Sequence, residues 1–250
     1  MEETTLNLLG VNVKGNTKTS ILEKIKKYIS SPNGFFHIVS INPENIIVAR
    51  RNQEFKRVIE TAHITHVDGI GIVLAGRILG HSFGERVAGV DLMKELLLLA
   101  QKMRLQVLFI GGEPNLANKL AECYSYELPE AKFYGISGIK NIRKPERNEE
   151  EKIFSIVASL RPRLIFVSFG SPYQELWLYR HRDKLKGAVC MGVGGAFNYL
   201  SGKVFRAPKF IRRFGFEWLY RLISQPWRLV RQTRLILFLY LIIKEKIFGK

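Results

Sequence analysis

Short apolar runs rich in β-branched and aromatic residues alternate along the chain with segments of helical period. A run at 35–40 leads into a helical segment at 43–51, 64–67 into 70–79, 107–110 into 114–124, and 164–169 into 172–184. Strands that alternate with helices in this way are typical of βαβ units with parallel strands. The sequence therefore predicts an α/β domain whose mostly parallel sheet is flanked by helices.

The pattern changes after Gly202. Pro208 and Pro226 interrupt short helical pieces, and nine consecutive apolar residues follow at 235–243. At ~1.5 Å per residue, nine residues cover about 13 Å, less than half of a ~30 Å hydrocarbon core. We therefore predict an α/β domain over 1–202 and a helical appendage over 203–250 that attaches to a membrane surface or packs against another subunit.

Charge is concentrated in the same region. The 250 residues include 39 Lys and Arg against 22 Asp and Glu, a net charge of +17, and 12 basic against two acidic residues at 202–250 give that stretch +10. Such an excess points to nucleic acid, anionic lipid or a diphosphate compound as partner. The three aspartates, Asp68, Asp91 and Asp183, stand singly, so no pair of them can hold a divalent cation. We expect no metal site and no cofactor.

The cysteines and the start of the chain indicate a compartment. Cys123 and Cys190 are far apart and lie among apolar residues, so we expect two buried free thiols in a reducing environment. The acidic residues near the start are not followed by the apolar core of a secretory signal. Both features favour the cytoplasm.

Three strand-to-helix turns share a small polar residue followed by Pro or Gly. They contain Asn42, Asp68 and Ser171, each of which suits the N-cap of the next helix, and Gln174 falls where the partner of a capping box belongs. Taken singly, each of these turns is explained by helix capping. In a parallel sheet, however, all of them leave the same edge, together with a Gly-rich turn at 192–195, so they point to one ligand crevice.

Other motifs are less informative. His63 and His66 are three apart on a predicted strand, which sends their side chains to opposite faces and disfavours joint metal binding. Arg86 lies in a charged turn, where it either forms a solvated ion pair or binds an anion. The Gly-x-Gly-x-x-Gly fingerprint and the P-loop are absent, which argues against a nicotinamide-dependent oxidoreductase on the same fold.

Seven stretches of the chain, in order, resemble motifs of the bacterial WecG/TagA/CpsF glycosyltransferase family. They are residues 42–44, 68–71, 85–92, 170–175, 192–195, 206–208 and 217–222. The resemblance runs along nearly the whole chain. It implies a Rossmann-like catalytic domain, 1–202, and a membrane-associating appendage, 203–250.

The resemblance also implies an activity. The family carries out an inverting, metal-independent transfer of an N-acetylmannosamine-type sugar from UDP to N-acetylglucosaminyl-diphospho-undecaprenol, for wall teichoic acid or a related surface polymer. The partners would be the UDP-sugar, the lipid-linked acceptor and an anionic membrane at its cytoplasmic face, with a homo-oligomer as a further option. UDP-N-acetylmannosaminuronic acid is the alternative donor. A nucleic-acid-binding protein is the alternative from another class, but Trp218, Trp227 and the run at 235–243 in the basic tail favour a bilayer.

Site residues follow from the same resemblance. Asp68 matches the general base, and Ser40 stands where Thr is usual but keeps the hydroxyl. Asn198 stands where Asp is usual and brings no charge to the donor. The implied catalytic residues are Asp68, Ser40, Arg221, Arg228 and Arg231, and the implied substrate contacts are Asn42, Arg86, Gln174, Gly194, Asn198 and Arg206.

Overall fold

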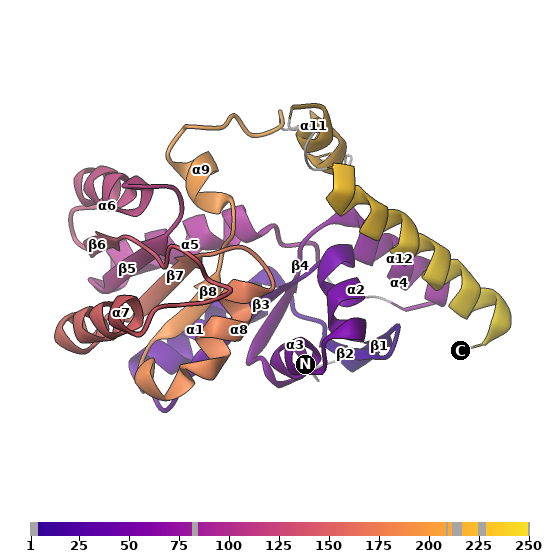
Figure 1. Ribbon diagram of the computed structural model, residues 1–250, viewed down its shortest axis with the longest axis horizontal. Helices are drawn as coiled ribbons and strands as arrows, with labels where there is room; N and C mark the ends of the chain where they lie inside the picture. Colours follow the sequence, from indigo (N-terminus) through magenta and orange to yellow (C-terminus); the bar gives the residue numbers. More distant parts are fainter. Residues whose placement is uncertain (1–4, 82–84, 209, 212–216, 225–228, 250) are drawn as a thin grey trace.

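A six-stranded parallel sheet forms the centre of the computed structural model, which describes residues 5–81, 85–208, 210–211, 217–224 and 229–249 (Figure 1). The strands lie in the order β4-β3-β8-β7-β5-β6. Their bounds are β3 (Phe36–Ile41), β4 (Ile64–Val67), β5 (Gln106–Gly111), β6 (Lys132–Ile136), β7 (Leu164–Ser168) and β8 (Val189–Gly192). The predicted α/β class with a parallel sheet is confirmed.

Helices cover both faces of this sheet because its strands alternate apolar side chains between two cores. On β5, Val107 and Phe109 enter one core and Leu108 and Ile110 the other. The first face is covered by α1 (Lys18–Ser30), α5 (Gly89–Met103), α6 (Leu116–Glu127) and α9 (Ala196–Leu200). The second is covered by α2 (Pro43–Arg51), α3 (Gln53–Thr61), α4 (Ile70–Leu79), α7 (Arg147–Leu160) and α8 (Tyr173–Arg180).

Several elements differ from the sequence expectation. The antiparallel hairpin of β1 (Thr5–Leu8) and β2 (Val11–Lys14) was not predicted, and neither were α1, α3, α5 and β6. The segment predicted as a helix at 172–184 ends at Arg180 and continues as a short 3-10 turn, η1 (Arg182–Lys184). The Cys190 thiol is buried as expected, but the Cys123 thiol is exposed because it lies on the outer side of α6, beside Glu127. Both cysteines are free.

The appendage contains α11 (Glu217–Ser224) and α12 (Leu229–Phe248), and α12 runs along α2 and α4 (Figure 1). Phe238 and Ile242 are fully buried in the same apolar cluster as α2 and α4. Arg234 Nη1 donates to Glu44 Oε1 at 2.6 Å. In the described part of the chain, no helix is long and apolar enough to cross a membrane. The appendage is thus attached to the α/β domain by an apolar contact and an ion pair.

Phe238 gives a test of this attachment. Replacing it by alanine removes a fully buried aromatic ring and leaves a cavity, which costs about 3–5 kcal/mol. We expect faster hydrogen exchange along α12 in Phe238→Ala. The matched control is Ile236→Ala on the same helix, whose side chain is 70% exposed and whose loss should leave exchange unchanged. Equal exchange in both variants would contradict the packing described here.

Candidate active site

The predicted site residues lie at the carboxyl ends of neighbouring strands, which all open at one edge because the sheet is parallel. Asp68 follows β4 and Asn42 follows β3, and the glycine turns that begin at Gly170 and Gly192 follow β7 and β8. The expectation that these turns share one edge is confirmed.

Asp68 is half-buried directly after β4, and its backbone N–H donates to Ile41 O at 2.8 Å. The expected N-cap role is wrong for this residue. Gly69, at a φ of +111° that favours glycine, takes the cap position of α4, and no side chain bonds there. Among the described residues, the Asp68 carboxylate makes no hydrogen bond or ion pair. It is therefore available for chemistry.

The turn after β3 contains Ser40 and Asn42. The Asn42 side chain caps α2 by accepting from Asn45 N at 2.9 Å, as predicted. Asn45, which the sequence did not single out, is buried and donates from Nδ2 to Ser40 O at 2.8 Å. Ser40 itself pairs in register with His66 on β4. The Ser40 hydroxyl thus lies on β3, the strand next to β4, which ends one residue before Asp68.

Gln174 is buried between two glycine turns. Its Oε1 accepts from Gly170 N at 3.1 Å and from Gly194 N at 3.0 Å, so these two amides are already engaged. A Cβ on Gly192 would lie 2.7 Å from the Gln174 side chain, which is why residue 192 is a glycine. The capping-box role expected for Gln174 is wrong, because α8 has no side-chain cap. The amide instead fixes the turns after β7 and β8 to each other.

A buried polar network continues from Gln174. Gln174 Nε2 donates to Glu175 Oε1 at 2.8 Å, and burial raises the pKa of the Glu175 carboxyl. The Ser171 hydroxyl, expected to cap α8, instead donates to Asn45 Oδ1 at 2.9 Å. The network therefore ties the turn after β7 to the turn after β3.

Asn198 lies on α9 and meets an acid from another strand. Its Nδ2 donates to Glu113 Oε1 at 3.2 Å, in the loop after β5. The Lys203 ammonium also bonds to Glu113 and is the main cause of the lowered pKa of that carboxyl. A carboxylate is therefore present beside position 198, although it comes from Glu113 and residue 198 is an amide.

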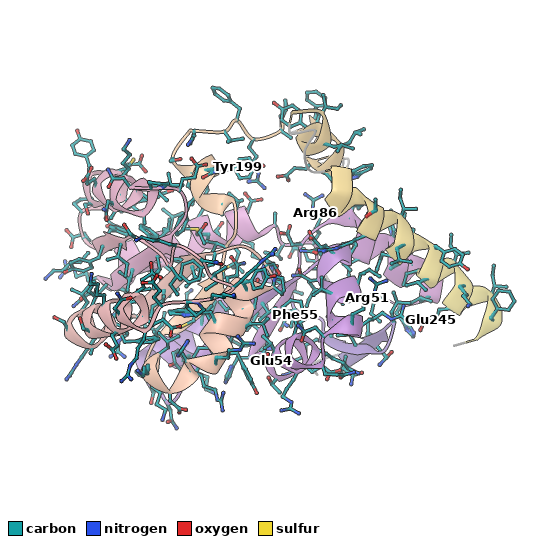
Figure 2. All side chains as sticks on the ribbon, in the orientation of Figure 1. Arg51, Glu54, Phe55, Arg86, Tyr199 and Glu245 are labelled. Carbon is teal, nitrogen blue, oxygen red and sulfur yellow. The ribbon has the colours of Figure 1, made fainter. Side chains whose placement is uncertain are left out.

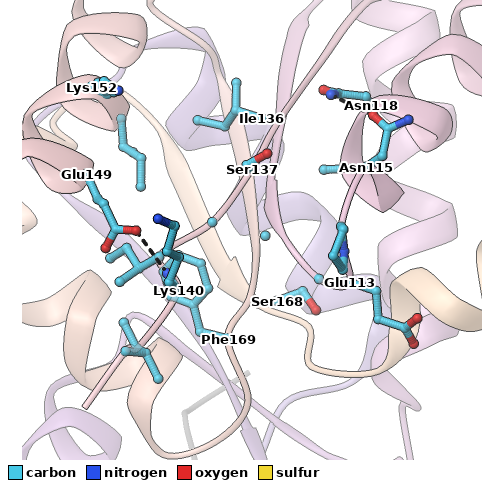
Figure 3. Close-up of a pocket in the computed structure, with 18 of the residues that line it drawn as sticks. Glu113, Asn115, Asn118, Ile136, Ser137, Lys140, Glu149, Lys152, Ser168 and Phe169 are labelled. Carbon is cyan, nitrogen blue, oxygen red and sulfur yellow. Dashed lines mark hydrogen bonds between the residues drawn. The ribbon is translucent and has the colours of Figure 1, made fainter. Parts of the chain in front are cut away.

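A cavity of about 790 Å³ lies at the carboxyl ends of β5, β6 and β7 (Figure 3). Its volume is in the range of small-molecule sites. Glu113, Asn118 and Ser137 bring polar groups to it, and Phe169 brings an aromatic ring. Lys140 is held at the wall because its backbone N–H donates to Glu149 Oε1 at 3.2 Å. The cavity combines apolar wall with a few polar groups, as a site for a nucleoside would.

Comparison with known proteins identifies the family. The model of the glycosyl transferase WecG/TagA/CpsF family matches residues 6–250. The chain belongs to this family. It is a glycosyltransferase.

Relatives of this glycosyltransferase come from Bacillus and Staphylococcus species. The chain is 30% identical over 245 residues to a protein of Bacillus subtilis strain 168, covering 98% of this chain and 92% of the relative. It is 34% identical over 203 residues to one of Bacillus spizizenii, covering 80% and 76%. It is 30% identical over 247 residues to one of Staphylococcus aureus strain MW2, covering 96% and 93%. All three are named N-acetylglucosaminyldiphosphoundecaprenol N-acetyl-beta-D-mannosaminyltransferase.

An ion cluster joins the appendage of the glycosyltransferase to its active-site edge. Arg206 donates to Asp91 through both Nη atoms, at 2.5 and 3.0 Å, and lies 3.4 Å from Glu217 through Nε. Arg86, labelled in Figure 2, reaches the other oxygen of Glu217 at 3.8 Å. Glu217 is buried at the start of α11. Both arginines expected to bind substrate thus pair with acids that hold the appendage.

The other predicted arginines belong to the appendage. Arg221 lies on α11 and Arg231 on α12, whereas Arg228 lies outside the described residues. Sequence reasoning missed the partners that the structure adds, namely Asn45, Glu113, Glu175 and Glu217. Glu175 and Glu217 lie inside the family-like stretches 170–175 and 217–222, which gave them no role of their own. Asn45 stands three residues after the cap Asn42, where its backbone N–H donates to the capping oxygen. No local signal marks Glu113.

Gln174→Ala tests the bridge between the glycine turns. The change leaves the N–H groups of Gly170 and Gly194 without their acceptor, at about 1–3 kcal/mol each. We expect the free energy of unfolding, measured by urea denaturation, to fall by the sum of the costs of these two unpaired N–H groups. Gln101→Ala is the matched control, because it removes one exposed bond to Glu130 N and should cost about 0.5–1.5 kcal/mol. Similar losses in the two variants would refute the bridging role.

Proposed function

We propose that this glycosyltransferase transfers N-acetylmannosamine from UDP to N-acetylglucosaminyl-diphospho-undecaprenol, with inversion at the anomeric carbon. The observation that carries the proposal is the similarity along 92–98% of both chains to proteins of that name. UDP-N-acetylmannosaminuronic acid is the alternative donor. Assay of a panel of UDP-sugars against the lipid-linked acceptor tests the proposal, and turnover of a different sugar alone would overturn the donor assignment.

Asp68 is the proposed general base. An inverting displacement needs one group to take the proton of the acceptor hydroxyl, and the Asp68 carboxylate makes no bond to other described residues. Its place at the carboxyl end of β4, beside the strand that carries Ser40, supports the role. The Ser40 hydroxyl would hydrogen-bond to the substrate from the adjacent strand.

The leaving group needs positive charge. UDP gains negative charge as the bond to the sugar breaks, and arginine can hold a diphosphate through two N–H groups at once. We assign this role to Arg221, Arg228 and Arg231 of the appendage. Arg86 and Arg206, for which the family resemblance implies substrate contact, are paired with Glu217 and Asp91.

The cavity of Figure 3 suits the nucleoside end of the donor. It begins at β7, and β7 is three strands from β4 in the sheet, so about 14 Å separate the two at ~4.8 Å per strand. A nucleotide with its base in the cavity and its phosphates across the turns after β7 and β8 would present its sugar towards Asp68. Glu113, next to Asn198, would then accept from the ribose hydroxyls.

The outer side of α12 is the proposed membrane contact. Ile236, Tyr240, Ile243 and Ile247 are spaced four, three and four residues apart, which places them on one side of the helix, and each is 50–70% exposed. Lys and Arg accompany them on the same helix. An exposed apolar stripe among basic residues fits the surface of an anionic bilayer, at its cytoplasmic face.

Asp68→Asn should keep the fold and lose most turnover, because an amide cannot take the acceptor proton. Loss of a general base lowers kcat by about 10²–10⁴. Turnover is measured with the lipid-linked acceptor, and Asp183→Asn serves as control, since Asp183 lies in the exposed turn η1 and pairs with Lys186. Near-normal turnover of Asp68→Asn would remove Asp68 from the role of base.

Replacing both Ile243 and Ile247 by serine should weaken sedimentation with anionic liposomes, because two of the four apolar side chains of this stripe are lost. Binding of the parent protein should fall with salt without vanishing, since salt screens only the charged part. Leu98→Ser is the control: this side chain is 56% exposed on α5, away from the appendage. If the double variant sedimented like the control, α12 would not be the membrane contact.

A further inference from the structure

His66 is a buried histidine of β4 with one ring nitrogen left unpaired. Its Nδ1 lies 2.8 Å from Val87 O, and only 1% of the residue is exposed. A carbonyl oxygen can only accept, so Nδ1 carries the hydrogen and Nε2 keeps a lone pair. Nε2 has no hydrogen-bond partner among the described residues. A buried acceptor without a donor is costly and calls for an explanation.

The position of His66 connects it to the proposed base. His66 and Asp68 are two residues apart along one extended segment, so both side chains project to the same face of the sheet. A Cβ placed on Gly89 would lie 3.6 Å from Asp68 Oδ2 and equally 3.6 Å from His66 Cε1. The Asp68 and His66 side chains thus flank the same small space beside Gly89, at the start of α5. The His66 atom that faces this space is Cε1, and Nε2 is covalently bonded to Cε1.

We propose that His66 is a positioning residue for proton transfer, whose Nε2 accepts a hydrogen bond from the Asp68 carboxyl once Asp68 has taken the acceptor proton. This inference rests on the proposed function, because it assumes Asp68 as base. In the step, the O–H bond of the acceptor breaks and its oxygen bonds to the anomeric carbon of the donor. The bond from that carbon to UDP breaks with its electron pair leaving on UDP, and the proton ends on Asp68.

The surroundings keep the imidazole neutral and ready to accept. Burial lowers the pKa of His66, while the charge of Asp68 acts in the opposite direction. Among the described residues, the groups beside the ring on neighbouring elements are uncharged, since Ser40 on β3 and Met191 on β8 carry no charge and Gly89 has no side chain. Arg86 and Asp91, in the adjoining loop and first turn of α5, are engaged with Glu217 and Arg206.

This arrangement would make Asp68 a stronger base. A hydrogen bond that forms only with the protonated carboxyl favours that form. The lone pair of Nε2, which has no donor in the resting state, gains one as the proton arrives. The benefit therefore appears in the transition state, where it accelerates the reaction.

Two substitutions separate this role from a purely structural one. In His66→Asn the side-chain N–H can still donate to Val87 O, but nothing replaces Nε2. In His66→Gln the amide oxygen can reach the place of Nε2. We expect His66→Asn to lower kcat about ten-fold, with the KM for the UDP-sugar unchanged, and to move the acid limb of the pH–rate profile to lower pH. In His66→Gln we expect kcat and the position of the acid limb to return most of the way to those of the parent protein.

A spectroscopic measurement keeps the test independent of how well the variants fold. ¹⁵N chemical shifts of labelled histidine in the intact protein report which nitrogen carries the hydrogen. We expect neutral His66 with the hydrogen on Nδ1 at pH 7 to 8, and a shift of the Nε2 resonance in Asp68→Asn, whose side-chain N–H can donate to it.

Three results would overturn the inference: a hydrogen on Nε2 in the intact protein, a His66→Asn variant with unchanged kcat and acid limb, or a His66→Gln variant as impaired as His66→Asn. Failure of the proposed function is distinguishable. If Asp68→Asn remained active, the base assignment itself would fail. If Asp68→Asn were inactive and His66→Asn fully active, the fault would lie in the role of His66 alone.

Discussion

The buried side chain of Gln174 is the constraint on which the active-site edge depends. Its one oxygen accepts from Gly170 and Gly194, so the ends of β7 and β8 are held in a single relative position. The same side chain occupies the space that a side chain at Gly192 would need, which fixes glycine there. A buried amide that serves two turns makes each of them dependent on the other, because losing the amide leaves two donors unpaired at once.

The appendage depends on this edge in turn. Glu217 begins α11 and lies between Arg86, from the segment between α4 and α5, and Arg206, which also binds Asp91 at the start of α5. Opposite charges that are partly buried and share partners hold position better than exposed pairs, since breaking one leaves another charge uncompensated. The appendage is thereby fixed beside Asp68 at one end and along α2 and α4 at the other. The outer side of α12 stays exposed to solvent.

How far the sequence predicts this structure depends on how many residues along the chain separate the partners of each interaction. The strand at 64–67, the helix at 43–51 and its Asn42 cap follow from local pattern and were confirmed. The α5 helix was missed although its buried residues Val90, Met93, Leu96, Leu97 and Ala100 recur at helical spacing. The capping roles predicted for Asp68 and Ser171 were wrong for two different reasons. Gly69, with a positive φ, occupies the N-cap position of α4, and the Ser171 hydroxyl donates to Asn45, which belongs to another element.

The site residues also divide into those that the sequence identified and those that depend on contacts between distant elements. Asp68, Ser40 and Asn198 were singled out from the family resemblance, and the fold brings each of them to the carboxyl edge. The carboxylate beside Asn198 comes from Glu113, 85 residues away, and the acid beside Arg206 from Asp91, 115 residues away. Spacing along the chain carries no information about such pairs. Only the packing of elements brings them into contact.

The sheet order also separates the two tasks that a sugar transfer requires. Asp68, the proposed base, lies directly after β4 at one edge of the sheet, whereas the cavity lies towards the other edge, at β5, β6 and β7. Between them β3, β8 and β7 carry the polar network from Asn45 to Gln174, which sets the distance between the two parts. Loops after β5 and β6 can therefore change to suit the nucleotide without moving Asp68.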